Sequence, residues 1–307
     1  MSAPGLARRR TITIIAATCA SVLAVPSVLP RHEWHGTALG AEGRLIFHGL
    51  DGNRVDELIA MVIAEVDRLE QVFSLYRPGS EVGRLNRTAT LKSASHDLKV
   101  VLAAALDVWR RSGGAFNPAI QPLWAMLTRH FAGRVDRADP DHRQILATLD
   151  LCNPAQIALE REAIRLKPGM ALTFNGIAQG YITDRVASLL RQHGLNDTLV
   201  QLGETHALPG RAWPVEVAGT GRLIDLRNGA IATSAAGGTR FSDDGRWHHL
   251  IDPKSGRSCH DFKSITVCAS SAMTADALST ALAVAGSGNA AGIARRFPHT
   301  RVLTETR

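Results

Sequence analysis

The order of strand-like and helix-like segments constrains the fold of this chain more than any other feature. Apolar residues at helical spacing predict helices over 55–75 and 98–109, a short helical piece over 80–86, and a helix from 175 to about 194. Apolar alternation and short apolar runs predict strands over 37–47, 157–166, 198–202, 215–218, 229–233, 247–253 and 265–270. Because the two kinds of segment are mixed without regular strand–helix alternation, the pattern favours an α+β fold.

The first 30 residues have the pattern of a targeting segment. Arg8, Arg9 and Arg10 precede an apolar run over 12–29, which gives a basic region followed by a hydrophobic region. The arginine run followed by Thr-Ile is similar to a twin-arginine export signal, although an ordinary secretory signal or an uncleaved membrane anchor has a similar pattern. We therefore expect a periplasmic protein, either released or held by an uncleaved membrane anchor, whose folded domain covers residues 31–307.

Charge and cysteine content exclude several classes of function. The formal charge is +7 over 307 residues, but the basic residues are dispersed. A nucleic-acid partner is not expected without a concentrated basic patch, whereas a diphosphate-bearing small molecule suits this charge. Beyond the leader the chain has Cys152, Cys259 and Cys268 and no CxxC motif, so neither a disulfide framework nor a zinc site is predicted.

An acid and a hydroxyl are spaced for one helical face in the segment SAMTADALSTA, residues 271–281. Asp276 and Thr280 are four residues apart in an Ala- and Leu-rich stretch that is expected to be helical. A carboxylate and a hydroxyl are hard oxygen ligands of the kind that Mg²⁺ prefers. The alternative is an exposed Asp and a Thr that hydrogen-bonds its own helix.

A second candidate site lies where a strand-like run ending at Phe174 enters the next helix through Asn175 and Gly176. Unpaired N–H groups and the helix dipole at such an entry favour phosphate. The stretch matches neither GxGxxG nor GxxxxGK[ST], so a Rossmann or P-loop nucleotide site is not indicated. The alternative interpretation is a tight helix entry that needs glycine for packing alone.

Taken together, seven ordered stretches resemble the hallmarks of the ApbE family of FAD:protein FMN transferases. They are SLYRPGSEVGRLN (74–86), GGAFNPAIQPL (113–123), FNGIAQGYITD (174–184), VQLGE (200–204), ATSAA (232–236), HLIDPKSG (249–256) and TADALSTAL (274–282). The resemblance spans nearly all of the chain after the leader. It implies mixed sheets with flanking helices, similar to the T-fold, and an FAD cleft between two lobes.

The resemblance also implies a reaction and a metal. Members are exported, Mg²⁺-dependent enzymes that cleave FAD, transfer FMN to a threonine or serine hydroxyl of a flavoprotein and release AMP. The metal ligands of the family fall on Asp276, Thr280 and the backbone carbonyl of Ala178, and Asp276 is thereby also a catalytic residue.

Other positions carried over from the family concern FAD and proton transfer. His249 is the general-base candidate because imidazole has a suitable pKa, with an orienting or structural role as the alternative. Asn117 stands where relatives have Asp, Gln179 where many have Lys, and Glu204 where a second glycine is common. The expected FAD-lining residues are Tyr76, Ala115, Phe116, Asn117, Asn175, Tyr181 and Ile251.

Three functions remain open from the sequence. Flavin transfer to a protein is the first, FAD hydrolysis to FMN and AMP by the same residues is the second, and non-catalytic FAD binding is the third. This chain has no DGxTGAT-like acceptor motif, so the acceptor is expected to be another protein. The segment over 34–41 is similar to the entry strand of exported members, some of them linked to nitrous-oxide reductase assembly, which suggests a respiratory membrane protein as acceptor.

Overall fold

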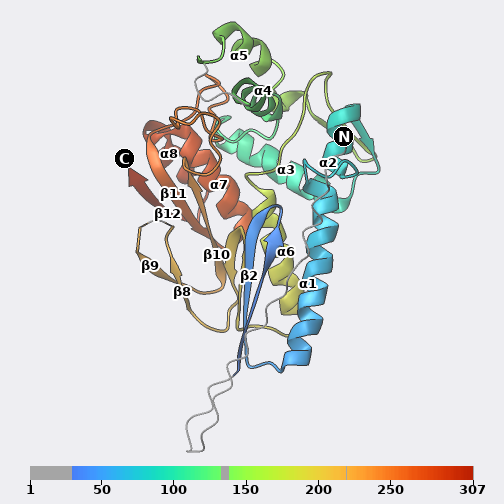
Figure 1. The fold of residues 1–307 in the computed structure, drawn as a ribbon, viewed down its shortest axis with the longest axis vertical. Helices are drawn as coiled ribbons and strands as arrows, with labels where there is room; N and C mark the ends of the chain where they lie inside the picture. The colour runs from blue at the N-terminus through green and yellow to red at the C-terminus, as the bar shows by residue number, and fades with distance from the viewer. Residues whose placement is uncertain (1–29, 133–137, 219, 307) are drawn as a thin grey trace, which may run out of the picture.

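A seven-stranded antiparallel sheet organises the computed structural model, which describes residues 30–132, 138–218 and 220–306. The strand order is β1-β2-β6-β7-β10-β11-β12, and each neighbouring pair is antiparallel (Figure 1). These strands are β1 (Arg31–Ala38), β2 (Ala41–His48), β6 (Thr198–Leu202), β7 (Glu204–Ala207), β10 (Gly229–Ala235), β11 (Phe262–Ala269) and β12 (Arg301–Thr306). The α+β class expected from the sequence is confirmed.

Smaller strands and the helices complete the fold. A hairpin is formed by β8 (Trp213–Glu216) and β9 (Leu223–Leu226), and a three-stranded sheet by β3 (Thr90–Lys92), β5 (Ala163–Arg165) and β4 (Ala158–Leu159). The helices are α1 (Gly52–Phe73), α2 (Glu81–Thr88), α3 (His96–Arg111), α4 (Gln121–Phe131), α5 (His142–Leu149), the 3₁₀ turn η1 (Pro154–Gln156), α6 (Ala178–Gln192), α7 (Ala272–Ala285) and α8 (Ser287–Ala294).

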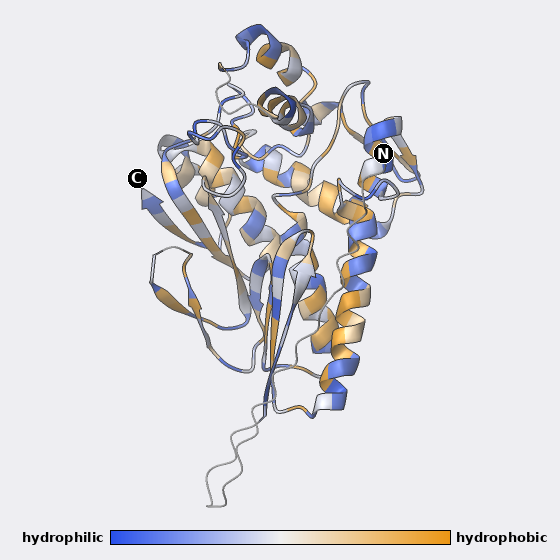
Figure 2. Cartoon of the chain, viewed as in Figure 1, coloured by the Kyte–Doolittle hydropathy of each residue, from blue (hydrophilic) through white to orange (hydrophobic). Residues whose placement is uncertain are grey.

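The two faces of the large sheet are covered differently. On one face, Leu45, Val200 and Ile265 join the main core together with α1, α3, α6 and α7. On the other face, Ile46, Leu199 and Ile231 pack against the β8–β9 hairpin in a separate, smaller core. Figure 2 shows hydrophobic residues concentrated on the inner strands and along α1. The alternation of side chains along each strand therefore builds one core with helices and one with a hairpin.

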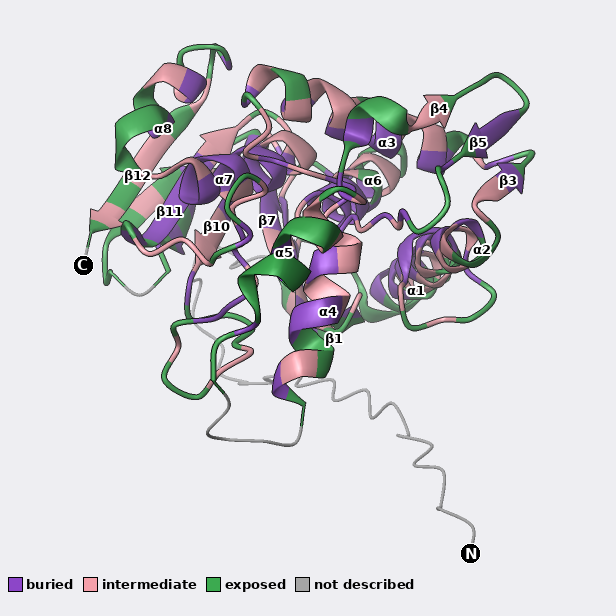
Figure 3. Cartoon of the chain, turned by 90° about the horizontal axis from the view of Figure 1, so that it is seen from above, coloured by how far each residue is buried: buried purple, intermediate pink, exposed green. Residues whose placement is uncertain are grey.

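Helix α7 lies at the centre of the main core, which explains its composition. Ten of its residues are buried, among them the acid Asp276, and Figure 3 shows the helix almost entirely in the buried class. A helix that is apolar all round belongs inside a domain. A glycine of α6 allows the two helices to come close, since a Cβ added at Gly180 would lie 2.3 Å from the carbonyl oxygen of Ala272 in α7.

The structure corrects three of the strand predictions. The run 37–47 is a hairpin and not a single strand, since β1 and β2 are joined by Leu39 and Gly40, both with positive φ (47° and 82°). Leucine rarely occupies this turn conformation, so the sequence carried little sign of it. The run 157–166 is broken into two short strands, β4 and β5, and follows directly on η1. The stretch 247–253 forms no strand and pairs only through isolated bridges at His248 and Ile251.

The predicted targeting segment falls almost wholly outside the described residues, which begin at Pro30. None of the helices in the described part of the chain combines the length and apolar character that crossing a membrane requires. Cys152, Cys259 and Cys268 are free thiols, and burial raises the pKa of Cys152 to about 11.

Candidate active site

A cleft of about 540 Å³ brings together residues from segments far apart in the sequence. It lies where the entry of α6, the end of β10 and α7 meet the loops before α2, before α4 and after β10. Residues named in the sequence analysis that line it are Tyr76, Ala115, Phe116, Asn117, Asn175, Gln179, Glu204, His249, Ile251, Asp276 and Thr280. This convergence makes the cleft the candidate active site.

Asp276 is a buried acid that the fold places against the start of α6. Its side chain is 4% exposed, and Oδ2 accepts a hydrogen bond of 3.0 Å from the N–H of Gly180. Burial, with a smaller contribution from the negative charge of Asp184, raises the pKa of Asp276 to about 7 although the Gly180 N–H opposes it. Without a cation, this carboxyl is therefore partly protonated at neutral pH.

Asp184 fixes the position of the helix that carries Asp276. Its carboxylate accepts hydrogen bonds from the N–H groups of Ala272 and Met273, at 2.8 and 3.0 Å, and from the hydroxyl of Ser271 at 2.7 Å. It also lies 2.8 Å from Nδ1 of His206. A carboxylate at a helix N-terminus accepts hydrogen bonds from the unpaired N–H groups, and its negative charge interacts favourably with the helix dipole. Because Asp184 belongs to α6, these contacts fix the register of α7 on α6.

Thr280 lies one turn beyond Asp276 and faces the sheet. Its hydroxyl is 3.2 Å from the hydroxyl of Ser234 in β10, and no hydrogen bond to its own helix is formed within the described structure. A Cβ added at Gly176 would lie 3.0 Å from Oγ1 of Thr280, so the loop before α6 touches this hydroxyl. The alternative of an exposed Asp and a back-bonded Thr does not describe this helix.

The entry to α6 differs from the expected strand–turn–helix anion site. Residues 171–174 form no strand, and Ile177 at the N-cap provides no side-chain cap. The N–H of Gly180 donates to the carboxylate of Asp276. This N–H group at the start of α6 is therefore not free to bind a phosphate. Ala178 is buried in this first turn, two residues before Gly180, and it is not among the residues that line the cleft.

Glu204 is a site residue that the sequence analysis noted only as a departure from the family pattern. It begins β7, lines the cleft, and its carboxylate is hydrogen-bonded by the backbone of Thr233. Burial, and then repulsion from Asp276, raises the pKa of Glu204 well above its usual value. The available signal was an acid directly after Gly203, whose φ of +89° sets the turn between β6 and β7.

The donor set around Asp276 suits a divalent cation. The negative charge of Asp276 contributes to the raised pKa of Glu204, and a cation between the two carboxyls would relieve this repulsion. Hydroxyl and carboxylate oxygens are the ligands that Mg²⁺ prefers, and it commonly keeps several waters. No group of three or more His, Cys, Asp and Glu able to hold a metal occurs among the described residues, so any protein-held site here also needs hydroxyl or backbone oxygens.

His249 is placed to act as a base. Its Nδ1 lies 3.1 Å from the carbonyl oxygen of Thr239, and Nε2 has no hydrogen-bond partner within the described structure. Nδ1 also lies 3.2 Å from the N–H of Thr239, so Thr239 can meet this nitrogen as donor or as acceptor. In the tautomer with the proton on Nδ1, the lone pair on Nε2 is left for a substrate. Burial lowers the pKa of His249 although the Thr239 contact opposes this, so the neutral imidazole prevails at neutral pH.

The remaining predicted residues line the cleft in different ways. Tyr76 is 79% exposed at the rim, which leaves its ring free to cover a ligand. Phe116 and Ile251 are buried and form an apolar part of the cleft wall. Asn175 is exposed at the entry to α6.

Asn117 is fixed by the protein on both ends of its amide. Its Nδ2 donates to the carbonyl of Cys152 at 2.8 Å, and its Oδ1 accepts from the N–H of Ala119 at 2.8 Å. An aspartate could not donate the first of these bonds. The Asn therefore stabilises the loop before α4, and its side-chain amide is already occupied.

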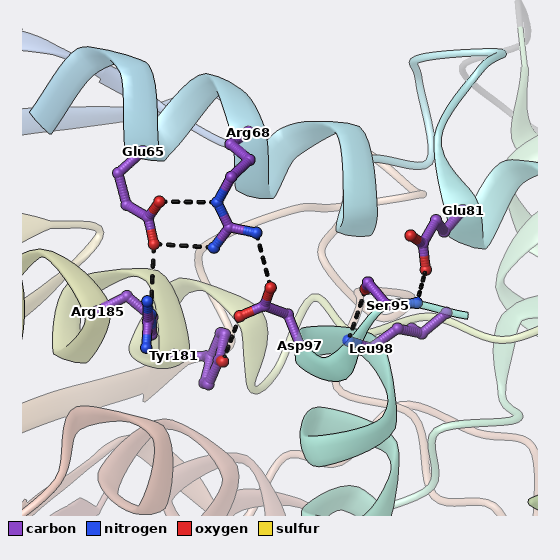
Figure 4. Close-up of polar contacts among 8 residues, drawn as sticks. All are labelled: Glu65, Arg68, Glu81, Ser95, Asp97, Leu98, Tyr181 and Arg185. Carbon is purple, nitrogen blue, oxygen red and sulfur yellow. Dashed lines mark hydrogen bonds and ion pairs between the residues drawn. The ribbon is translucent and has the colours of Figure 1, made fainter. Parts of the chain in front are cut away.

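Tyr181 is the one predicted FAD-lining residue that the structure places away from the cleft. Its ring packs edge-on against Phe73, with centroids 5.7 Å apart, and its hydroxyl donates to Oδ1 of Asp97 at 2.6 Å (Figure 4). Asp97 also accepts from Arg68 at 2.7 Å. Burial would raise the pKa of Asp97, but these hydrogen bonds outweigh it and hold the pKa below its usual value. Tyr181 thus joins α6 to α3 and, through Arg68, to α1.

Comparison with known proteins gives consistent results. The model of the ApbE family matches residues 39–304. An FAD:protein FMN transferase of Treponema pallidum is 31% identical over 275 residues, which covers 79% of this chain and 75% of that protein. A protein of the same name from Escherichia coli K12 is 26% identical over 289 residues, covering 85% and 80%.

Solved structures share the fold. The apo flavinyl transferase ApbE of Pseudomonas stutzeri aligns with a TM-score of 0.78 at 24% identity, over 92% of this chain and 97% of that one. The flavin transferase ApbE of Vibrio cholerae aligns with a TM-score of 0.75 at 24% identity, over 90% and 94%.

Proposed function

The chain belongs to the ApbE family, and from this premise we propose that it is an FAD:protein FMN transferase, an enzyme that moves FMN from FAD to a target protein. The observation that carries the proposal is the cleft itself. It gathers Tyr76, His249, Asp276 and Thr280, which come from three separate stretches of the sequence, around a single hollow large enough for part of a dinucleotide.

We further propose that Mg²⁺ is the cofactor. The ion would be held by Asp276, Thr280 and the backbone carbonyl of Ala178. The carboxyl of Glu204 lies close enough to Asp276 for the two to interact electrostatically, so a bound ion would act on both. When bound, the ion would neutralise pyrophosphate oxygens and the charge that develops on them. The support for this proposal is the all-oxygen donor set and the repulsion between the carboxyl of Glu204 and that of buried Asp276.

The side chains of the protein would then orient the reactants and take up a proton. Tyr76 covers the isoalloxazine ring, and Phe116 provides apolar wall beside it. Nε2 of His249 accepts the proton of a threonine or serine hydroxyl on the acceptor protein. As the proton leaves, the hydroxyl oxygen bonds to the phosphorus in the FMN half of FAD. The bond between that phosphorus and the bridging oxygen breaks, and AMP leaves with the bridging oxygen.

The reaction is tested with the purified protein, FAD, Mg²⁺ and an acceptor protein that carries a DGxTGAT-type segment. We expect the acceptor to gain the mass of one FMN unit, with one AMP released for each acceptor modified, and neither product when EDTA is present. AMP without a mass gain would support FAD hydrolysis instead. FAD bound but unchanged would support a non-catalytic FAD-binding protein.

We also propose that the protein acts in the periplasm on a respiratory flavoprotein. The support is the basic and apolar pattern of residues 8–29, which lie outside the described structure. Fractionation of bacteria that produce the full chain would locate the protein, with the substitution of Arg9 and Arg10 by lysine as the comparison. Retention of that variant in the cytoplasm is the expected result.

A further inference from the structure

Three hydroxyl groups lie in contact between β10 and α7, beside the residues proposed to hold the metal. The hydroxyl of Ser234 in β10 is 2.8 Å from that of Ser279 and 3.2 Å from that of Thr280, both in α7. Ser279 in turn donates to the backbone carbonyl of Asp276 at 2.9 Å. We call these three hydroxyls and this carbonyl the hydroxyl network. It begins at the side chain of one proposed metal ligand and ends on the backbone of the other.

The hydrogens of the hydroxyl network have one arrangement in which all three contacts are hydrogen bonds. A hydroxyl has a single hydrogen to donate, and a carbonyl oxygen can only accept. Because Ser279 donates to the carbonyl of Asp276, its contact with Ser234 must be donated by Ser234. The hydrogen of Ser234 is then used, so its contact with Thr280 must be donated by Thr280. Thr280 is therefore the first donor, and its oxygen accepts none of these bonds.

Ser279 also occupies the acceptor that a helical threonine ordinarily uses. Ser and Thr in helices commonly donate to the carbonyl three or four residues earlier. For Thr280 the residue four positions earlier is Asp276, whose carbonyl already accepts the hydroxyl of Ser279. An α-helix places the N–H of residue 280 on the same carbonyl, so both lone pairs of that oxygen are used. The hydroxyl of Thr280 is thus left to bond Ser234 instead of its own helix.

The surrounding structure holds the two ends of this contact in place. Ser234 pairs with Ile265 of β11, which belongs to the core on the helix face of the sheet. Residues directly opposite in neighbouring strands share a face, so Ser234 faces the helices. On the other side of Thr280, a Cβ added at Gly176 would lie 3.0 Å from Oγ1 and 3.3 Å from Cγ2. The side chain of Thr280 is therefore confined between β10 and the loop before α6.

We infer that Ser234 and Ser279 are positioning residues for the proposed magnesium site. They hold the hydrogen of the Thr280 hydroxyl toward the sheet and leave its oxygen lone pairs for an ion in the cleft, which Thr280 lines. The inference rests on the proposed function, which assigns Mg²⁺ to Thr280 and Asp276. A hydroxyl that coordinates a cation is a stronger donor, so metal binding and the contact with Ser234 reinforce each other.

The test measures Mg²⁺ binding and so does not depend on FMN transfer. Mg²⁺ is titrated by calorimetry into the metal-free protein, and its dissociation constant is compared among variants. Ser234→Ala removes the acceptor of the Thr280 hydrogen, and Ser279→Ala frees the carbonyl of Asp276 for the usual bond within the helix. Ser279 is buried and is not among the residues that line the cleft, so its effect on the ion must pass through its neighbours.

Ser264→Ala in β11 is the matched control. Ser264 is also a buried serine of the large sheet, and its hydroxyl lies 3.3 Å from a carboxylate oxygen of Glu305, outside the cleft. The free energy of unfolding in urea is measured for each variant. The control therefore reports what the loss of a sheet hydroxyl does when the Thr280 contact is intact.

We expect Ser234→Ala to raise the dissociation constant for Mg²⁺ about three- to tenfold, as is typical for the loss of one hydrogen bond, and Ser279→Ala to raise it less. Ser264→Ala should leave it unchanged. In a Thr280→Val background, which lacks the hydroxyl, Ser234→Ala should cause no further loss of affinity. The transfer rate of Ser234→Ala at saturating Mg²⁺ should return to near the wild-type value, because the hydroxyl network acts through the ion.

Other outcomes would overturn the inference. Unchanged Mg²⁺ affinity in Ser234→Ala and Ser279→Ala would show that the hydroxyl network does not position Thr280. An equal loss of affinity in Ser264→Ala, or one that persists in the Thr280→Val background, would show a general effect on the fold. If the wild-type protein binds Mg²⁺ but transfers no FMN, the proposed function fails while the binding data still decide this inference. If the wild type binds no Mg²⁺, the metal assignment and this inference fail together.

Discussion

Asp276 and His249 derive their chemical character from opposite consequences of burial. Burial removes water from the charged form of each group. It therefore raises the pKa of Asp276 to about 7, since the carboxylate is the charged form, and lowers the pKa of His249, since the imidazolium is the charged form. At neutral pH the carboxyl of Asp276 is partly protonated and can lose that proton when a cation binds. The imidazole of His249 is already neutral and can accept a proton.

The state of Asp276 predicts how Mg²⁺ binding depends on pH. A metal ligand must be deprotonated, so protons compete with the ion below the pKa of the carboxyl. We expect the apparent dissociation constant for Mg²⁺, measured by calorimetry on the metal-free protein, to rise by up to about tenfold per pH unit below pH 7. Asp276→Asn should remove both tight binding and its pH dependence, with Asp107→Asn on the surface of α3 as the control. A pH-independent affinity in the wild type would contradict the assignment of Asp276.

The state of His249 predicts the acid limb of the transfer rate. Because its pKa is lowered from 6.5, the rate should stay high from pH 8 down to 6.5 and fall as pH decreases through a midpoint below 6.5. His249→Ala should lower kcat by roughly 10²–10⁴ and abolish that limb, while FAD binding is retained. Rate–pH profiles at saturating FAD, acceptor and Mg²⁺ provide the measurement. An unchanged midpoint in the variant would assign the limb to another group.

At the scale of elements, the contact between α6 and α7 holds the site together. The N–H of Gly180 binds Asp276, and the backbone of Ala272 occupies the space where a side chain at position 180 would be. Asp184 in α6 binds the first residues of α7. The backbones of the two helices are therefore in direct contact at the first turns of α6 and α7. The residues proposed to hold the metal, Ala178 in α6 and Asp276 and Thr280 in α7, lie close to this contact.

Gly180→Ala tests this contact. The added methyl would lie 2.3 Å from a backbone oxygen, so α6 must move away from α7. We expect the free energy of unfolding in urea to fall by more than about 1 kcal/mol, despite the better helix propensity of alanine. Gly288→Ala in α8, where nothing lies within 4 Å, should be neutral or slightly stabilising. Equal stability of the two variants would contradict the close approach.

Tyr181→Phe tests the role of the buried tyrosine. The variant keeps the ring against Phe73 but loses the hydrogen bond to Asp97. We expect a loss of about 1.5–3 kcal/mol of stability, as for hydrogen bonds to charged groups, with an unchanged dissociation constant for FAD. Weaker FAD binding at unchanged stability would instead support a place in the FAD site.

These elements also show what the sequence could predict and what it could not. Strong periodicity predicted α1, α3 and the segment of α7, because an amphipathic or apolar pattern is a local property. The hairpin between β1 and β2 was missed because its turn contains Leu39 in a conformation that leucine seldom adopts. The surroundings of Tyr181 and Glu204 could not be read from the sequence, because their neighbours, Asp97 and Asp276, are distant in sequence and come together only in the tertiary structure.

On the scale of the whole molecule, the fold converts separate short stretches into one cleft. The helical face of the sheet supplies α6 and α7, and the end of β10 places Ser234 beside Thr280. The family resemblance named residues from separate stretches, and most of them line this cleft. Their convergence there is a property of the tertiary structure.

A crystal structure with FAD and Mn²⁺ in place of Mg²⁺ tests this account most directly. We predict a manganese anomalous peak within bonding distance of the Asp276 carboxylate and the Thr280 hydroxyl, with the pyrophosphate of FAD on the same ion and the flavin ring against Tyr76. A peak away from Asp276, or FAD bound outside this cleft, would contradict the account.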